Sequence, residues 1–327
     1  MRAHVVVNRR ARLLRDGGPL LDELCRARPG IEVHETGSLE ELDALVRALM
    51  AGAKGRREAF VFAGGDGSYM AGVSALARAA ARSTDEDRQS EGGASQEEPL
   101  PPVAFAPGGT VCTVARNWGM SGNRVRWLAR LLDAIADDSV RVTRRPSLRV
   151  RDGRGGDRVG FIFGGGLVAR FFELYDARGA GGNVAAARIV ARVFAGSFVR
   201  SPFARRVLEP SACAITIDGA PAPFDRVSLL CASVVRDLGL KMRLTYRAGE
   251  ELERFHTVAT PLGPRALGPQ MPLVLAGRPL VGAHIDDLVA HLGLSFPRGT
   301  GAYVLDGDLL RADAITVNAG PVLKVLG

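Results

Sequence analysis

Short apolar runs alternate with stretches of helical periodicity over the first 145 residues. Runs of strand type cover residues 4–8, 31–36, 59–63 and 103–106. Between and after them, apolar positions spaced for one helical face predict helices from residue 38 onward, over 69–82, near 110–118 and over 124–136. Strands that alternate with helices in this way predict a parallel sheet covered by helices on both faces.

The pattern changes at about residue 146. Short runs of β character cover 147–151, 159–163, 212–218, 227–235, 242–247 and 257–259, and helical segments at 168–177 and 184–207 interrupt them. The end of the chain predicts a strand–turn–strand over 303–308 and strands over 314–318 and 322–326. We therefore expect an α/β domain over 1–145 and a β-rich domain over 146–327. Whether the segment 312–327 returns to the first domain is left open.

Two segments are ambiguous by pattern. Residues 83–98 carry six acidic side chains, one arginine and no large apolar side chain, which predicts a mobile, solvated loop. The segment 184–207 combines apolar and arginine positions. Such a helix either lies in a membrane interface or packs its apolar stripe into the core, and core packing is the commoner case.

The amino-acid composition argues against a nucleic-acid-binding, a zinc-binding and a membrane-spanning protein. The chain has 46% hydrophobic residues and a net charge of +8 that comes almost wholly from arginine. The arginines are scattered and no aromatic residues are interleaved with them, so a nucleic-acid partner is not expected; a basic surface facing anionic lipid or ATP is the alternative. The four cysteines show no CxxC spacing, and no apolar run approaches about 18 residues. These features predict a cytoplasmic protein with reduced thiols, without a zinc site and without a membrane span.

The segment Gly64-Gly65-Asp66-Gly67-Ser68 follows a predicted strand and precedes a predicted helix. Glycines that lack Cβ let backbone N–H groups approach phosphate oxygens, and a helix N-terminus favours an anion. Asp66 suits Mg²⁺ binding or proton acceptance, whereas the structural alternative is a tight turn in which Asp66 caps a helix. Pro107-Gly108-Gly109-Thr110 repeats the arrangement after the next strand. Neither loop has the dinucleotide-binding or Walker pattern.

Four segments in this order carry a resemblance to a known family: Asn8, Gly64 to Ser68, Pro107 to Thr110, and Asp306-Gly307-Asp308. The chain resembles the diacylglycerol kinase catalytic-domain family, which includes sphingosine kinases and bacterial lipid kinases and is distantly related to NAD kinases. The resemblance implies a Rossmann-like parallel-sheet domain followed by a β-sandwich-like domain. It also implies an ATP- and Mg²⁺-dependent kinase whose acceptor is a lipid alcohol, either diacylglycerol-like or sphingoid.

The resemblance also implies roles for individual residues. The residues implied to hold the ATP phosphates and to complete the nucleotide cleft are Asn8, Gly64, Gly65, Gly67, Ser68, Gly109 and Thr110. Asp306, or with less support Asp66, would deprotonate the acceptor hydroxyl, and Asp308 would help to hold Mg²⁺. The implied partners are the lipid substrate and a peripheral surface at the inner face of the membrane. A homodimer is left open.

Four departures from the family pattern stand in the sequence. Arg9 replaces a proline, Val111-Cys112-Thr113 stands where the family has Gly-Asn-Asp, and Asp308 replaces a glutamate. The fourth, Ser68 in place of a threonine, is mild. The resemblance implies that the amide and the carboxylate of the family's Asn-Asp pair, which Cys112 and Thr113 lack, would face the nucleotide or the metal. Two alternatives therefore stay open: a relative that binds nucleotide or lipid without catalysis, and a kinase for a soluble substrate, as in NAD kinases. His256, His284 and His291 show no ligand spacing and are expected at the surface or as caps.

Overall fold

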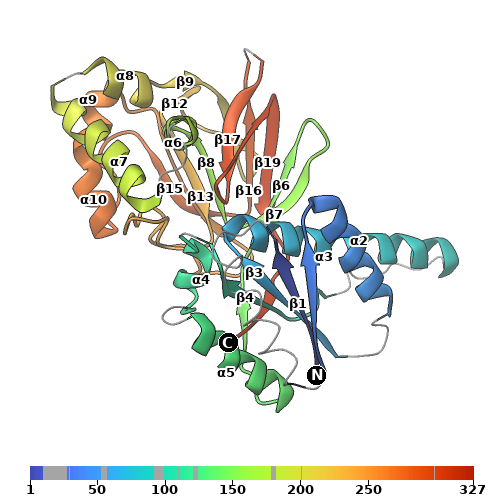
Figure 1. Ribbon diagram of the computed structural model, residues 1–327. Coiled ribbons are helices and arrows are strands. Elements are labelled where there is room, and N and C mark those ends of the chain that lie inside the picture. Colours follow the sequence, from blue (N-terminus) through green and yellow to red (C-terminus); the bar gives the residue numbers. More distant parts are fainter. Residues whose placement is uncertain are drawn as a thin grey trace. The chain divides into compact units, whose positions relative to one another are not determined.

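The computed structural model describes residues 1–9, 28, 30–52, 57–91, 99–109, 111–120, 124–177, 182–199, 201–297 and 299–327. The chain forms two compact units, one of Met1–Arg145 with Pro321–Gly327 and one of Pro146–Gly320. Figure 1 shows the helices and the parallel strands of the first unit and the antiparallel strands of the second.

Within its described residues, the first unit has a six-stranded sheet in the order β2-β1-β3-β4-β20-β5. Its strands are β1 (Arg2–Asn8), β2 (Ile31–Thr36), β3 (Glu58–Gly64), β4 (Val103–Pro107), β5 (Val142–Arg145) and β20 (Leu323–Leu326). The strands β2, β1, β3 and β4 run parallel, β20 joins β4 in parallel, and β5 closes the edge antiparallel. The expected parallel sheet is confirmed.

Helices cover both faces of this sheet. They are α2 (Leu39–Gly52), α3 (Asp66–Glu91), α4 (Thr113–Asn117) and α5 (Arg124–Ala136). Alternate strand residues such as Val5 and Val61 pack against Leu132 and Ile135 of α5. On the other face, Gly72 of α3 approaches the buried ring of Phe62. Because each strand presents side chains to both faces, the two layers of helices explain why β3 is buried throughout.

The expectation of a loop over 83–98 is wrong for its first part. Helix α3 continues to Glu91, and residues 92–98 lie outside the described residues. The segment 83–91 contains neither glycine nor proline, and polar residues such as glutamate, arginine and glutamine have good helix propensity. An acidic, solvated composition therefore did not distinguish a loop from a polar extension of a helix.

The second unit has two six-stranded antiparallel sheets in its described part, in the orders β11-β10-β16-β19-β6-β7 and β15-β14-β13-β8-β17-β18. The first contains β6 (Leu148–Asp152), β7 (Asp157–Gly160), β10 (Ala214–Ile217), β11 (Ala220–Pro221), β16 (His291–Ser295) and β19 (Ala314–Ala319). The second contains β8 (Ile162–Gly166), β13 (Leu229–Ser233), β14 (Phe255–Thr260), β15 (Ile285–Val289), β17 (Gly301–Leu305) and β18 (Asp308–Ala312). A small pair, β9 (Ser211–Ala212) and β12 (Arg226–Val227), stands apart.

The helices of this unit are α6 (Leu167–Asp176), α7 (Gly182–Phe198), α8 (Pro202–Leu208), α9 (Pro264–Leu267) and α10 (Met271–Ala276). The expected single helix over 184–207 is two helices, because Pro202 starts α8 and Ser201 caps it through the N–H of Ala204. Ile189 and Val193 pack in a core cluster, whereas Val184 and Phe198 are exposed, so only part of the apolar stripe is core. Across the described residues, no helix combines the length and apolar character needed to span a bilayer.

Other strand predictions need correction. The expected strand over 159–163 is broken at Phe161, where the chain leaves one sheet as β7 and enters the other as β8. The segment 242–247 forms turns instead of a strand. It follows three consecutive residues with positive φ, Gly239, Leu240 and Lys241, and such residues end extended pairing. The strands β15 and β16 and the helices α9 and α10 had no clear sequence signal.

Two hairpin turns hold the points where strands change sheet. Asp306-Gly307 and Asp218-Gly219 both have positive φ at each position, as a type I′ turn requires. The Asp306 carboxylate accepts the N–H groups of Phe161 and Ile162 at the junction of β7 and β8. In the same way, Asp218 accepts the N–H groups of Ala290 and His291 at the junction of β15 and β16. Each aspartate N–H also bonds to the second junction residue, to the carbonyl of Ile162 or of His291.

The space around two helical glycines, Gly72 in α3 and Gly52 at the end of α2, predicts opposite effects of substitution. A Cβ at Gly72 would lie 2.4 Å from the buried Phe62 ring, so we expect Gly72→Ala to lower the free energy of unfolding by about 1–3 kcal/mol. At Gly52 no described atom lies within 4 Å of such a Cβ, and Gly52→Ala should raise stability by up to about 1 kcal/mol. Urea unfolding of both variants measures the difference, and equal effects would contradict the packing.

Candidate functional site

The two glycine loops of the first unit lie against each other. Strands β3 and β4 pair in parallel with Gly64 opposite Pro107, so both loops leave the same edge of the sheet. The carbonyl of Gly64 accepts the N–H groups of Gly108 at 2.7 Å and Gly109 at 2.9 Å. A Cβ at Gly109 would lie 2.5 Å from the Cα of Gly65. Only glycine at residue 109 permits this approach of two backbones.

The first strand contributes to the same edge. The side-chain amide of Asn8 donates to Ser68 Oγ at 2.9 Å, and a Cβ at Gly64 would lie 2.3 Å from that oxygen. The carbonyl of Gly65 accepts the N–H groups of Ser68 and Tyr69, so α3 begins directly at the loop. The N-terminus of this helix concentrates N–H groups and positive potential where Gly65 and Gly67 stand. Thr110, the remaining predicted residue of the second loop, lies outside the described residues.

Asp66 connects the first loop to the segment after the second. Its carboxylate accepts the N–H of Thr113 at 2.7 Å and the N–H of Val114 at 3.0 Å. Burial raises the pKa of Asp66, and the hydrogen bonds from Val114 and Thr113 oppose that rise. The capping alternative predicted a cap on the helix that Asp66 itself begins. In the structure, Asp66 caps the start of α4 instead.

Cys112 stands at the position where the resembled family has an asparagine. It has a left-handed backbone with φ 51° and is buried. Its thiol lies 3.4 Å from the carbonyl oxygen of Gly109 and 3.7 Å from that of Gly64, as a weak donor to both loops. The side chain therefore closes the loop backbone and presents no amide or carboxylate outward.

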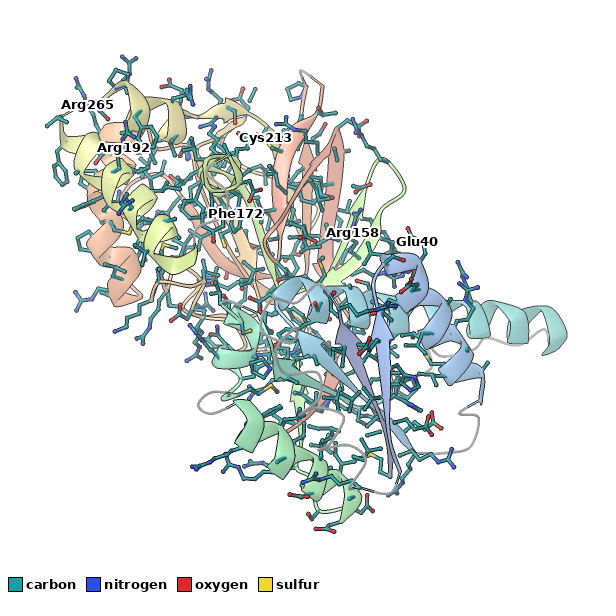
Figure 2. All side chains as sticks on the ribbon, in the orientation of Figure 1. Glu40, Arg158, Phe172, Arg192, Cys213 and Arg265 are labelled. Carbon is teal, nitrogen blue, oxygen red and sulfur yellow. The ribbon has the colours of Figure 1, made fainter. Side chains whose placement is uncertain are left out.

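In the second unit, Asp306 and Asp308 flank the turn between β17 and β18. A Cβ at Gly160 would lie 2.6 Å from Asp306 Oδ2, so this glycine leaves the space that the carboxylate fills. Partial desolvation raises the pKa of Asp308; the charge of Arg158 opposes that rise, and the charge of Asp176 adds to it. Figure 2 labels Arg158, which also pairs with Asp152 at 3.0 Å.

Sequence patterns did not single out Arg158 or Asp176. Both residues lie more than 130 positions before Asp308, and neither belongs to a recognisable motif. Arg158 lies on β7 and Asp176 at the end of α6, so tertiary packing and not sequence spacing brings their charges to bear on Asp308. A spacing rule along the chain could not have found them.

A cavity of about 460 Å³ lies in the second unit. Its buried wall includes Phe163, Leu230, Tyr303 and Cys213, and Arg170, Glu173 and Arg226 also line it. Figure 2 labels Cys213, whose pKa burial raises to about 11. The strands β8 and β17 that form part of this wall continue to the turn that carries Asp306. The cavity has the size and mixed lining of a small-molecule site.

The glycine run at the end of β8 has a packing role. A Cβ at Gly164 would lie 2.4 Å from Val168, and Gly166 has φ 60° with its Cβ direction blocked by the carbonyl of Ser228. These glycines end a packed strand and start α6. Gly165 and Gly166 also line the cavity, because absent side chains leave space there.

The expectation for His256 is wrong. This histidine is fully buried, and its Nε2 lies 2.6 Å from Asp286 Oδ1. Tyr246 donates to the other oxygen of Asp286 at 3.0 Å. These hydrogen bonds of His256, Asp286 and Tyr246 join β14 to β15 and to the turn before β14, so they stabilise the edge of the sheet. His291 is partly buried and bonds to Asn318, whereas His284 is near the surface.

The comparisons with known proteins bear on the fold. No family model matches the sequence, and no curated protein matches it. A solved diacylglycerol kinase from Bacillus anthracis matches 99% of this chain and 96% of its own, with 14% identity and a TM-score of 0.61. Two structures from that organism, provisionally named diacylglycerol kinases, match 99% of this chain and 94% and 97% of theirs. Their identities are 15% and 14% and their TM-scores 0.67 and 0.63. The chain has the same fold as these proteins.

The contact between Asp66 and α4 predicts a loss of stability on truncation. Asp66→Ala removes the acceptor of two N–H groups at a helix start, and we expect the free energy of unfolding to fall by about 1–2 kcal/mol. Asp43→Ala is the control, since it removes a partly exposed ion pair with Arg78 that contributes about 0–1 kcal/mol. Urea unfolding compares the two, and a smaller loss for Asp66→Ala would refute the capping role.

Proposed function

We propose that the protein transfers the γ-phosphate of ATP to the hydroxyl of a lipid alcohol. The observation that carries this proposal is the pair of glycine loops at one sheet edge, locked together at Gly64 and Gly109. Two such loops with a long helix starting at the first suit a polyphosphate. Phosphoryl transfer depends on positioning and charge neutralisation, which such a backbone cradle supplies. The fold shared with the Bacillus anthracis proteins agrees with this assignment.

In this proposal the nucleotide binds to the first unit. Backbone N–H groups near Gly65 and Gly67 face the phosphates, while Asn8 orients Ser68 through their hydrogen bond. Asp66 acts as a positioning residue, because both of its oxygens hold the start of α4. Gly109 keeps the two loops in contact, and we assign Thr110 to the same cleft from the resemblance alone.

The second unit supplies the acceptor side. We assign Asp306 as the base that accepts the hydroxyl proton of the acceptor, since its carboxylate is oriented by Phe161 and Ile162 and orientation is the first need of a general base. The cavity beside β8 and β17 would take the apolar part of a diacylglycerol-like or sphingoid acceptor. Enzyme and substrate would meet at the inner membrane face, where the arginine-rich chain favours anionic lipid.

The carboxylate of Asp308 is the kind of oxygen donor that Mg²⁺ prefers, and the negative charge of Asp176 acts on it. When bound, the ion would neutralise charge on the transferred phosphoryl group. Asp308 would help to hold it, with the charges of Asp176 and Arg158 acting on that carboxylate.

The loop contact predicts that a methyl group at residue 109 weakens nucleotide binding. Gly109→Ala would force the backbones of the two loops apart, and we expect its affinity for ATP to fall at least about 10-fold, or about 1.4 kcal/mol. Gly65→Ala is the milder control, since its Cβ would lie 3.4 Å from the Cα of Gly109. Calorimetric titration with ATP measures both, and unchanged affinity in Gly109→Ala would exclude the loops as the nucleotide site.

The base assignment predicts a selective loss of activity. With γ-labelled ATP, Mg²⁺ and a lipid extract in mixed micelles, we expect wild type to label a lipid and Asp306→Asn to be slower by about 10²–10⁴-fold. Asp218→Asn is the matched control, because Asp218 makes the same turn and the same backbone bonds at the other sheet junction. If both variants lost activity equally, Asp306 would be structural and not the base.

The same assay separates the alternatives. Labelling of a soluble acceptor only would favour a kinase of the NAD kinase type. No transfer by folded protein that still binds ATP would favour a non-catalytic binder, for which the buried thiol of Cys112 in place of an outward amide is the specific argument. Chromatography of the labelled product identifies the acceptor.

A further inference from the structure

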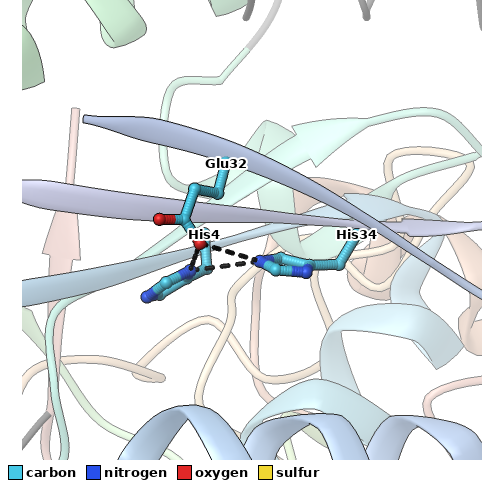
Figure 3. Close-up of side chains that lie close together, drawn as sticks. All are labelled: His4, Glu32 and His34. Atoms are coloured by element: carbon cyan, nitrogen blue, oxygen red, sulfur yellow. Dashed lines mark hydrogen bonds and ion pairs between the residues drawn. The ribbon is translucent and has the colours of Figure 1, made fainter. Parts of the chain in front are cut away.

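Three metal-ligating side chains converge on the first two strands of the first unit. His4 Nδ1 lies 3.1 Å from His34 Nε2 and 3.6 Å from Glu32 Oε2, and the last two atoms are 3.8 Å apart (Figure 3). The parallel register pairs His4 with Glu32, and His34 follows two residues later on β2. Side chains two residues apart on a strand share one face, so the backbone itself brings the three together.

These separations match one tetrahedral ion. Donors at 2.0–2.2 Å from a common tetrahedral centre are about 3.3–3.6 Å from one another. The three observed distances bracket that value. The side chain of Glu32 is half-exposed, so an ion can enter from solvent and keep a fourth position for water.

A buried glutamate sets the tautomer of His4. Glu58 Oε2 lies 3.1 Å from His4 Nε2, and both residues are buried. A carboxylate there holds the proton on Nε2, so Nδ1 presents its lone pair toward His34. A carboxylate behind a histidine ligand is the usual outer partner of a metal-bound imidazole.

The facing nitrogens of the two histidines share either a proton, in an N–H···N hydrogen bond, or a cation. Two lone pairs that face each other at 3.1 Å repel unless a proton or a cation lies between them. The half-exposed Glu32 carboxylate beside both nitrogens favours the cation.

We propose that His4, His34 and Glu32 bind a divalent transition-metal ion of the zinc class, and that Glu58 orients His4. Imidazole nitrogens suit zinc, copper and nickel ions, whereas Mg²⁺ prefers oxygen donors, so this site differs from the magnesium site proposed above. His4 precedes Asn8 by four residues, about 13 Å along β1, so the ion lies away from the glycine loops. The ion cross-links β1 to the edge strand β2 and stabilises that edge.

Direct titration tests the site. Tag-free, chelator-treated protein is titrated with Zn²⁺ by calorimetry and with Co²⁺ by visible absorption. We expect one tight ion per chain, the intense absorption bands of tetrahedral Co²⁺, and a higher Tm with Zn²⁺. His34→Ala and Glu32→Gln should each lower the affinity by more than about 100-fold, since each removes a direct ligand, and Glu58→Gln should lower it by about 10–100-fold.

The control is Glu35→Gln, which changes the same charge on the same strand at nearly the same exposure, 57% against 50% for Glu32. It should bind Zn²⁺ as wild type does. The proposal fails if wild type binds no stoichiometric Zn²⁺, if Glu32→Gln binds as tightly as Glu35→Gln, or if Mg²⁺ displaces the ion at comparable concentration. Glu32 is half-exposed, and the Tm of ion-free Glu32→Gln checks that the fold is intact.

Discussion

Two carboxylates in left-handed turn positions hold the second unit together. At Phe161 and at Ala290 a strand leaves one antiparallel sheet and enters the other, and the N–H groups at such breaks lose their ladder partners. A buried N–H without an acceptor costs about 1–3 kcal/mol. Asp306 accepts the buried N–H of Phe161, Asp218 makes the equivalent bonds at the exposed junction of Ala290 and His291, and the following glycines permit both turns. The cavity beside β8 depends on this, since β8 begins at one of the two breaks.

In the first unit, the main constraint is the close packing of two loops at one edge of the sheet. Parallel strands end at the same edge, so their connecting loops compete for the same space. The two loops fit at this edge because Gly64, Gly65 and Gly109 have no side chains, so the loops contact each other through backbone alone. The same absence leaves amide dipoles exposed at the start of α3. The absence of side chains at these glycines therefore explains both the close packing of the loops and their suitability for binding an anion.

Features of this chain that depend on neighbouring residues could be predicted from the sequence, whereas features that depend on contacts between distant residues could not. Strands β1 to β4 and their helices carried local periodicity and were predicted from it. The loop geometry was also predictable, because glycine in a short turn has few other uses. No sequence pattern indicated the features that depend on contacts between distant residues. These are the break at Phe161, the effect of Arg158 and Asp176 on Asp308, the burial of His256, and the contact of His4 with His34. Pairing register, which brings such residues together, is a property of the whole sheet.

The position of β20 has a consequence for the order in which the protein forms. This strand lies between β4 and β5, yet it follows the whole second unit in the chain. On a ribosome, which releases residues from the N-terminus onward, the second unit is complete before the first has its full sheet. Until then β4 and β5 have no strand between them, and an unpaired edge of this kind can recruit another chain. The newly made first unit therefore passes through an open stage that the finished molecule does not reveal.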